Sequence, residues 1–305
     1  MTVLQAGVPR SGNSLLYKAL SGLYREAGAP WRSYIAGHAI QQQAQSWELS
    51  LSGQAQIDMV SIEPLGCHLG ISSGFRELIR DFPGFVESCS LVWTHSPYDP
   101  GAADKFATFD QVLYIVRDPR DALVSMAHFH YTDYSRKVHH VSQGDPDSYI
   151  ERAAADFAWY WVKHVVSFLA ARKRLRVQLI RYEDLVRDLS AQLSSLAELL
   201  GLHVPTAGLD RLLGELDFRA MQASSPQHLR SGRPGVWRVE MSTEQVAHVE
   251  RIAGQLMESL GYSLTALANS VAVEGRMGPE SDKLRPLLAA AAKAARGSTT
   301  PGWTL

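Results

Sequence analysis

Residues 6–16 read AGVPRSGNSLL, and this stretch indicates the fold of the chain. Three residues match the phosphate-binding loop GxxxxGK, followed by Ser or Thr, of nucleoside-triphosphate enzymes: Gly7, Gly12 and Ser14. The lysine is missing, because Asn13 stands in its place and the nearest cation, Arg10, lies inside the loop. An apolar run precedes the loop and a helical pattern follows it. This order predicts an anion site made of backbone N–H groups at a helix N-terminus.

Short apolar runs alternate with helical patterns along the chain. The runs lie at residues 2–7, 58–64, 90–97, 111–119 and 176–184. The helical patterns lie at residues 13–30, 119–130, 150–172, 184–200 and 242–260. We therefore predict an α/β fold, a P-loop-type domain whose central parallel sheet is covered by helices on both faces.

Two regions depart from this alternation. Residues 132–149 are polar and contain Gly144 and Pro146, which favours a long loop or lid. The last part of the chain is rich in alanine, so residues 266–305 are expected to form a C-terminal helical extension and a flexible tail. The main domain is expected to span residues 1–265.

Composition limits the classes of partner. The 305 residues are 46% hydrophobic, enough for a large core, and carry a formal net charge of -1, so a nucleic-acid partner is not expected. The two cysteines, Cys67 and Cys89, are too few for a disulfide framework and lack zinc-site spacing. No leader and no apolar span long enough for a membrane is recognised. We expect a cytosolic protein without a membrane partner.

A second informative segment, YIVRDPRDALVSMAHF, covers residues 114–129. A strand ending at Val116 places Arg117 at its carboxyl end, where ligands bind in open α/β sheets. Ser125 lies two turns into the following helix, so the arginine and the hydroxyl can reach one anion together.

With the loop PRSGNS, this segment resembles the sulfotransferase family, which uses 3'-phosphoadenosine 5'-phosphosulfate (PAPS) as sulfuryl donor. Further stretches match family signatures: WTHSP at 93–97, RYEDL at 181–185, LDFRAMQ at 216–222 and LRSGRPGVWR at 229–238. All occur in family order between residue 3 and about residue 262. The resemblance implies a PAPS-dependent transferase that releases 3'-phosphoadenosine 5'-phosphate (PAP) and needs no metal.

The resemblance also implies the site residues. His95 would be the general base for the acceptor, and Arg10 would stabilise charge on the leaving phosphate. The donor-binding residues would be Arg10, Ser11, Gly12, Asn13, Ser14, Leu15, Arg117, Ser125, Tyr182, Phe218, Met221, Leu229, Arg230, Ser231 and Gly232. Within this set, the 3'-phosphate would contact Arg117, Ser125 and Arg230, and Phe218 would be the aromatic face for the adenine.

Several residues depart from the family pattern. Arg10 replaces the usual loop lysine, and Leu15 stands where many members have a tryptophan. Trp93 replaces a lysine two positions before the histidine, which removes a cation near the reacting group. Within the stretch LRSGRPGVWR, Ser231 and Val236 replace a lysine and an aspartate of the family signature. A modest rate is therefore expected.

The acceptor and two other functions stay open. Nine residues suggest an aromatic-lined pocket for a small molecule, a phenol, an alcohol, a sugar or an amine: Trp31, Tyr34, His38, Trp47, Phe75, Tyr98, Phe129, Tyr131 and Tyr134. A P-loop kinase would need the missing lysine and a magnesium-binding carboxylate. A nonenzymatic binding protein would have lost the base or the anion ligands, which are present. The sequence does not indicate the oligomeric state.

Overall fold

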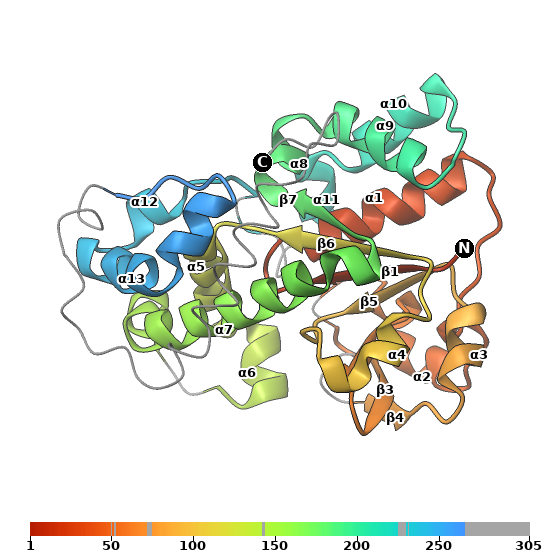
Figure 1. Ribbon diagram of the computed structural model, residues 1–305, viewed down its shortest axis with the longest axis horizontal. Helices are drawn as coiled ribbons and strands as arrows, with labels where there is room; N and C mark the ends of the chain where they lie inside the picture. Colours follow the sequence, from red (N-terminus) through yellow and green to blue (C-terminus); the bar gives the residue numbers. More distant parts are fainter. Residues whose placement is uncertain are drawn as a thin grey trace.

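The computed structural model describes residues 1–49, 51, 53–71, 75–141, 144–224, 230 and 232–265. At its centre lies a sheet of four strands in the order β5, β1, β6, β7 (Figure 1). The strands are β1 (Val3–Gly7), β5 (Leu91–Thr94), β6 (Gln111–Val116) and β7 (Val177–Arg181). All neighbouring pairs are parallel. The predicted parallel sheet is confirmed, and each strand falls in a predicted apolar run.

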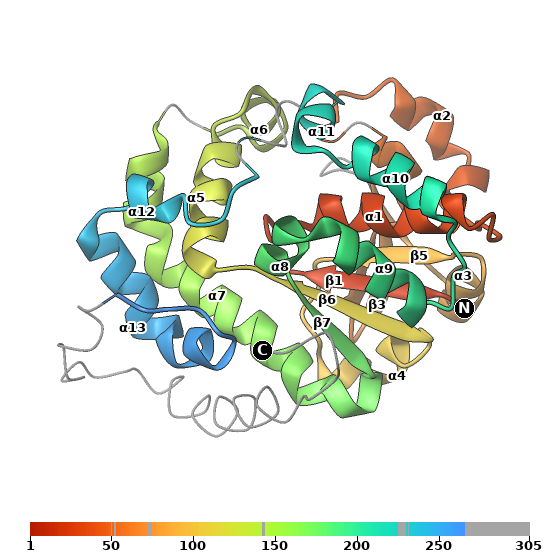
Figure 2. The same cartoon turned by 90° about the horizontal axis from the view of Figure 1, so that it is seen from above.

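Helices cover both faces of this sheet (Figures 1 and 2). Successive side chains of a strand point to opposite faces, so Val3 and Ile115 join one apolar cluster while Leu4 and Tyr114 join the other. The first cluster is completed by residues of α1 (Asn13–Glu26), α9 (Leu189–Leu199) and α10 (Thr206–Glu215). The second is completed by α5 (Pro119–His130) and α7 (Pro146–Leu175). Burial on both faces explains why the strands read as continuous apolar runs.

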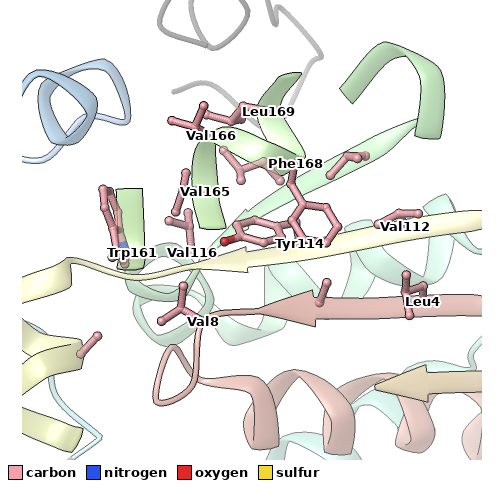
Figure 3. Close-up of a cluster of buried hydrophobic side chains, with 14 of the residues drawn as sticks. Leu4, Val8, Val112, Tyr114, Val116, Trp161, Val165, Val166, Phe168 and Leu169 are labelled. Carbon is pink, nitrogen blue, oxygen red and sulfur yellow. The ribbon is translucent and has the colours of Figure 1, made fainter. Parts of the chain in front are cut away.

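Helix α7 anchors the end of β6. Figure 3 shows Phe168 of α7 beside Tyr114 of β6, with Val165 and Trp161 nearer to Val116. The Tyr114 and Phe168 ring centroids lie 4.6 Å apart. Trp161 Nε1 also donates a hydrogen bond to the carbonyl oxygen of Arg117, at 3.1 Å. The buried face of α7 therefore fixes the backbone from which Arg117 projects.

The run at residues 58–64 was expected in the parallel sheet, and this expectation is wrong. Its strand, β2 (Val60–Glu63), pairs antiparallel with β3 (Gly66–Ile71), which pairs antiparallel with β4 (Phe75–Leu78). Burial alternates along β3, and β4 is largely exposed, so this second sheet has one solvated face. Strands β3 and β4 were not predicted from the sequence, because neither is a continuous apolar run.

The segment 132–149, expected to be a long loop, contains a helix, α6 (Asp133–His139), and the start of α7. Its polar residues cap these helices. Thr132 Oγ1 accepts a hydrogen bond from Ser135 N at 3.3 Å, and Asp145 Oδ1 accepts one from Ser148 N at 2.9 Å. Whether this segment acts as a lid stays a prediction.

The remaining helices are α2 (Ile40–Gln45), α3 (Phe82–Glu87), α4 (Ala103–Phe106), α8 (Tyr182–Arg187), α11 (Phe218–Ser224), α12 (Trp237–Glu240) and α13 (Thr243–Ser259), with short 3₁₀ turns at Ile35–Gly37, Gln54–Gln56 and Pro100–Ala102. The boundaries of α5 match the predicted helix, since Pro119 opens it and Asp118 caps it through Arg120 N. The expected C-terminal extension, residues 266–305, lies outside the described residues.

Candidate active site

A cavity of about 840 Å³ lies at the carboxyl ends of the parallel strands. Thirteen predicted site residues line it: Arg10, Gly12, Asn13, Ser14, Leu15, His95, Arg117, Ser125, Tyr182, Phe218, Met221, Arg230 and Gly232. Ser11 is fully buried in the loop beneath. Leu229 and Ser231 lie outside the described residues. The structure thus brings together segments that are far apart in the sequence.

The first loop has a backbone that favours glycine at one position. Gly12 has a φ of 94°, and a Cβ atom there would lie 2.3 Å from the Tyr182 ring, so a larger residue would collide with it. Arg10 also has a left-handed φ of 70°. Helix α1 begins at Asn13, so the N–H groups of its first turn have no acceptor within the helix. Such N–H groups, together with the helix dipole, can hold an anion at the cavity wall.

The side chain of Asn13 faces the loop itself. Its Nδ2 donates a hydrogen bond to the carbonyl oxygen of Val8 at 2.9 Å, and the residue is 3% exposed. Gln5 Nε2 in turn donates one to the carbonyl oxygen of Asn13, at 2.7 Å. Asn13 therefore braces the turn and does not supply the cation that a lysine would bring to this position.

Arg10 supplies positive charge in this part of the cavity. Its Nε donates a hydrogen bond to Ser125 Oγ at 3.2 Å, and its guanidinium carbon lies 4.6 Å from the Phe129 ring centroid. Burial, and next the nearby charge of Arg117, lower the pKa of Arg10 to about 10, so it stays protonated at neutral pH. From the sequence, Arg10 and Ser125 were assigned to different phosphates of the donor. In the structure a hydrogen bond joins their side chains, because the long side chain of an arginine can reach the next helix.

Arg117 lies deeper and is 7% exposed. Its Nη1 donates a hydrogen bond to the carbonyl oxygen of Arg10 at 3.1 Å, and its guanidinium carbon lies 4.4 Å from the Tyr182 ring centroid. Within the described part of the chain, Arg117 Nε is buried without a hydrogen-bond partner. One buried guanidinium group, of Arg117, and one half-buried group, of Arg10, line the same cavity and favour binding of an anion.

His95 follows strand β5, and its ring is held in one orientation. Its Nδ1 lies 2.7 Å from the carbonyl oxygen of Gly7. A carbonyl only accepts hydrogen bonds, so we assign the proton to Nδ1, which leaves the lone pair of Nε2 available. Burial is the main effect on the pKa of His95 and lowers it, and the nearby charge of Arg10 lowers it further. His95 can therefore accept a proton at neutral pH.

A buried polar chain supports His95 from behind. His164, on α7, lies with Nε2 3.1 Å from the carbonyl oxygen of His95 and donates to it. Its Nδ1 then accepts the O–H of Tyr114, at 2.8 Å. Burial lowers the pKa of His164 to about 4, so it stays neutral and keeps both contacts. No role for His164 or Tyr114 could be predicted from the sequence, because only the fold brings these two residues together.

We expect Tyr114→Phe to lower the free energy of unfolding by about 1–3 kcal/mol, because His164 Nδ1 would stay buried without its donor. Denaturant unfolding of the purified protein measures this change. Tyr160→Phe, at a side chain 39% exposed on the same helix as His164, is the matched control and should change stability little. An effect of Tyr114→Phe no larger than that of the control would contradict the assigned hydrogen bond.

Trp93 contacts His95 on the same side of β5, since the two residues are two positions apart. Their rings meet edge to face with centroids 5.5 Å apart, and Trp93 also packs 5.8 Å from Tyr17. It is 4% exposed and lines the cavity where the family pattern has a lysine. The wall beside the base is therefore aromatic and carries no charge at this position.

The expected aromatic acceptor pocket is only partly present. Of its nine residues, Phe129 and Tyr134 line the cavity. Four others pack against the apolar core instead: Tyr34, Trp47, Phe75 and Tyr98. Trp31, His38 and Tyr131 also lie outside the cavity lining. Five residues outside that expected set also line the cavity: Leu51, Met59, Trp93, Val124 and Met126.

The predicted adenine face, Phe218, lines the cavity together with Tyr182. The hydroxyl of Tyr182 donates a hydrogen bond to the carbonyl oxygen of Gly232 at 2.7 Å. Gly232 has a φ of 62°, and a Cβ atom there would lie 2.4 Å from the Phe218 ring, so this ring packs directly on the glycine backbone. Met221 lies beside them and is 3% exposed. Together they form an apolar slot with a hydroxyl at its edge.

The sequence of this chain is similar to that of a known protein family. The sequence profile of the sulfotransferase domain matches residues 2–261. This chain belongs to the sulfotransferase family. Mouse sulfotransferase 4A1 is 29% identical over 158 residues, which cover 50% of this chain and 54% of the mouse protein. Sulfotransferase 6B1 of Pan troglodytes is 28% identical over 186 residues, covering 55% and 57%. The chain thus spans little more than half the length of these relatives.

Solved structures show the same fold. Mouse sulfotransferase SULT7A1, crystallised with PAP, aligns with a TM-score of 0.53 at 17% identity, and the alignment covers 88% of this chain and 87% of that chain. Retinol dehydratase in a complex with retinol and PAP aligns with a TM-score of 0.55 at 17% identity, covering 87% and 82%. At this identity the likeness concerns the fold alone.

The structure adds lining residues to the predicted set. Arg219 and Arg233 line the cavity, and both fall inside the matched segments LDFRAMQ and LRSGRPGVWR, so a search for cations in these segments could have found them. Asp121, in the first turn of α5, also lines the cavity. Within the described residues, no group of three or more potential metal ligands occurs. No described helix is both long enough and apolar enough to cross a membrane.

Proposed function

We propose that this protein transfers a sulfuryl group from PAPS to a hydroxyl or an amine of a small molecule. The observation that carries the proposal is that His95, with its Nε2 lone pair available, lines the same cavity as Arg10 and Arg117. A proton acceptor and two cations thereby line one cavity. This combination suits a reaction in which an acceptor loses a proton while negative charge develops on a leaving phosphate.

The residues present fit the donor. Bound PAPS supplies the sulfur atom, whose bond to the 5'-phosphate oxygen breaks as its bond to the acceptor forms. Arg10 and the N–H groups at the start of α1 would hold the 5'-phosphate and stabilise the charge that it gains. Arg117, with its unpartnered Nε, and Arg230 would hold the 3'-phosphate, with Ser125 between the two subsites.

The adenine would bind in the part of the cavity that Phe218 and Tyr182 line. Phe218 offers an aromatic face, and Tyr182 and Met221 line the same slot. Leu15, in the first turn of α1, would provide apolar contact where other members have a tryptophan. Ser11 would help to shape the loop from below, since it is fully buried and does not line the cavity.

His95 would act as the base. Its Nε2 would take the acceptor proton, and the resulting positive charge would be shared with the carbonyl oxygen of Gly7 through Nδ1. Trp93 packs edge-on against the imidazole and limits its rotation. The hydrogen bond and the ring contact together keep the base aligned through the reaction.

The acceptor would bind beside His95, against the side chains Leu51, Met59, Trp93, Met126, Phe129 and Tyr134. This wall is mostly apolar, which suits a molecule with a hydrophobic body and one reactive hydroxyl or amine. We also propose that the protein works in the cytosol, in keeping with two buried cysteines that are unpaired.

We expect PAP to raise the melting temperature in the absence of magnesium, because a ligand that binds only the folded state stabilises it. ATP with magnesium should raise it much less, since the first loop lacks the lysine that holds a triphosphate. Thermal unfolding at matched ligand concentrations measures both shifts. An equal or larger shift with ATP and magnesium would favour a P-loop kinase instead.

A further inference from the structure

Arg230 lies at the rim of the cavity, and its side chain is 40% exposed. A long side chain at such a position samples many rotamers in water, and ordering them weakens the binding of any ligand that needs one geometry. The described structure contains a feature that reduces this loss. It is an ion pair between Arg230 and Glu240, which is not among the described residues that line the cavity.

Glu240, the last residue of α12, bridges Arg230 to His128 of α5. Its Oε1 accepts a hydrogen bond from Arg230 Nη1 at 2.7 Å, and its Oε2 lies 2.6 Å from His128 Nε2. The Glu240 and His128 side chains are 26% and 32% exposed. Among the described residues that line the cavity, Arg230 is present whereas Glu240 and His128 are not. The Glu240 carboxylate therefore contacts the Arg230 guanidinium from outside the set of lining residues.

Helix α5 holds the same segment at a second point. Asp121, in its first turn, accepts hydrogen bonds from the backbone N–H groups of Gly235 at 2.6 Å and Trp237 at 3.0 Å. Asp121 is 2% exposed, so both bonds are shielded from water. The segment that follows Arg230 is thus fixed to α5 at its middle by Asp121 and at its end through Glu240.

The arrangement puts the proposed ligands of one phosphate on a common support. Ser125 and His128 are three residues apart on α5, and therefore lie on the same side of that helix. The helix carries Ser125 directly and holds Arg230 through His128 and Glu240. With one guanidinium nitrogen occupied by Glu240, the other N–H groups of Arg230 stay available for a phosphate.

We propose that Glu240 is a positioning residue for the 3'-phosphate of the donor. It holds Arg230 in a fixed orientation against α5 while the guanidinium faces the cavity. The inference rests on the proposed function, because it takes Arg230 as a ligand of that phosphate. Glu240 acts through Arg230, so it affects ligands that carry a 3'-phosphate and not those that lack one.

The test measures binding of PAP and of adenosine 5'-phosphate, which lacks the 3'-phosphate, by titration calorimetry. Glu240→Ala should weaken PAP binding by about 5- to 30-fold, a fraction of the loss expected for a direct charged contact, and leave adenosine 5'-phosphate binding unchanged. In an Arg230→Ala background, Glu240→Ala should have no further effect, because the group it positions is gone. Glu244→Ala is the matched control, since that side chain is 88% exposed in the first turn of α13.

Three results would overturn the inference. The first is that Glu240→Ala binds PAP as tightly as the wild type or more tightly. The second is an equal loss of affinity for PAP and for adenosine 5'-phosphate. The third is a loss of PAP affinity that persists when Glu240→Ala is made in the Arg230→Ala background. Glu240→Gln keeps an oxygen acceptor for Arg230 and should retain more PAP affinity than Glu240→Ala. A wild-type protein that binds PAP no better than adenosine 5'-phosphate would instead contradict the proposed 3'-phosphate subsite itself, so the two failures are distinguishable.

Discussion

His95→Ala should lower turnover by about 10²- to 10⁴-fold, the usual contribution of a positioned general base, and should leave PAP affinity nearly unchanged. The base must be unprotonated to work, so the rate of the wild-type protein should fall as the pH falls through the pKa of His95. Burial lowers that pKa. The midpoint of this fall should therefore lie below about 6.5, the ordinary value of a histidine. Turnover of both proteins at saturating donor, measured across pH, tests this.

Acceptors of graded acidity separate the base from its neighbours. An acceptor that is already largely ionised needs no base, so it should partly rescue His95→Ala. His164→Ala cannot serve as a control, because His164 holds the backbone of His95. His248→Ala is suitable, since that histidine is 41% exposed on α13, outside the cavity lining. Near wild-type turnover of His95→Ala on a weakly acidic alcohol would remove His95 from the mechanism.

Arg10→Ala should lower both PAP affinity and turnover. The side chain would contact the 5'-phosphate in the bound donor and oppose the charge that grows on it during transfer. Loss of one such preorganised group costs about 10²- to 10³-fold in turnover. Steady-state kinetics together with PAP titration measure the two effects, and an ionised acceptor should not rescue this variant.

Two further substitutions define the role of Arg10. Arg10→Lys keeps the charge, restores the residue type usual in the family and should retain most of the activity, although the hydrogen bond from Nε to Ser125 would be lost. Arg25→Ala removes a 54% exposed arginine from the far end of α1 and should change neither quantity. An Arg10→Ala protein with normal turnover and normal PAP affinity would refute the proposed contact with the leaving phosphate.

The sequence allowed the central sheet to be predicted, because its strands are buried on both faces and therefore read as apolar runs between helical patterns. The boundaries of α5 were predictable for a local reason, since Asp118 and Pro119 are start signals. Strands β3 and β4 were not predicted, because one face of this small sheet is solvated. Helix α6 was missed because its capping residues resemble those of a loop.

The cavity residues could be predicted as far as the family motifs reach. Arg10, His95 and Arg117 follow the ends of three neighbouring strands, so a parallel sheet brings them together. The acceptor wall could not be predicted in the same way. Tyr34 and Phe129 look alike in the sequence, yet the first packs on the core and the second lines the cavity. Contacts such as Glu240 with Arg230 depend on tertiary packing that no local pattern shows.

The central claim is sulfuryl transfer from PAPS to a small molecule. The most direct measurement incubates the protein with PAPS and a library of phenols, alcohols, sugars and amines without magnesium, and quantifies PAP and acceptor products by mass spectrometry. We expect at least one acceptor to gain a sulfuryl group in an amount equal to the PAP released. His95→Ala should reduce the sulfated product and the released PAP together. Tight PAP binding with no acceptor-dependent release of PAP from PAPS across the library would contradict it.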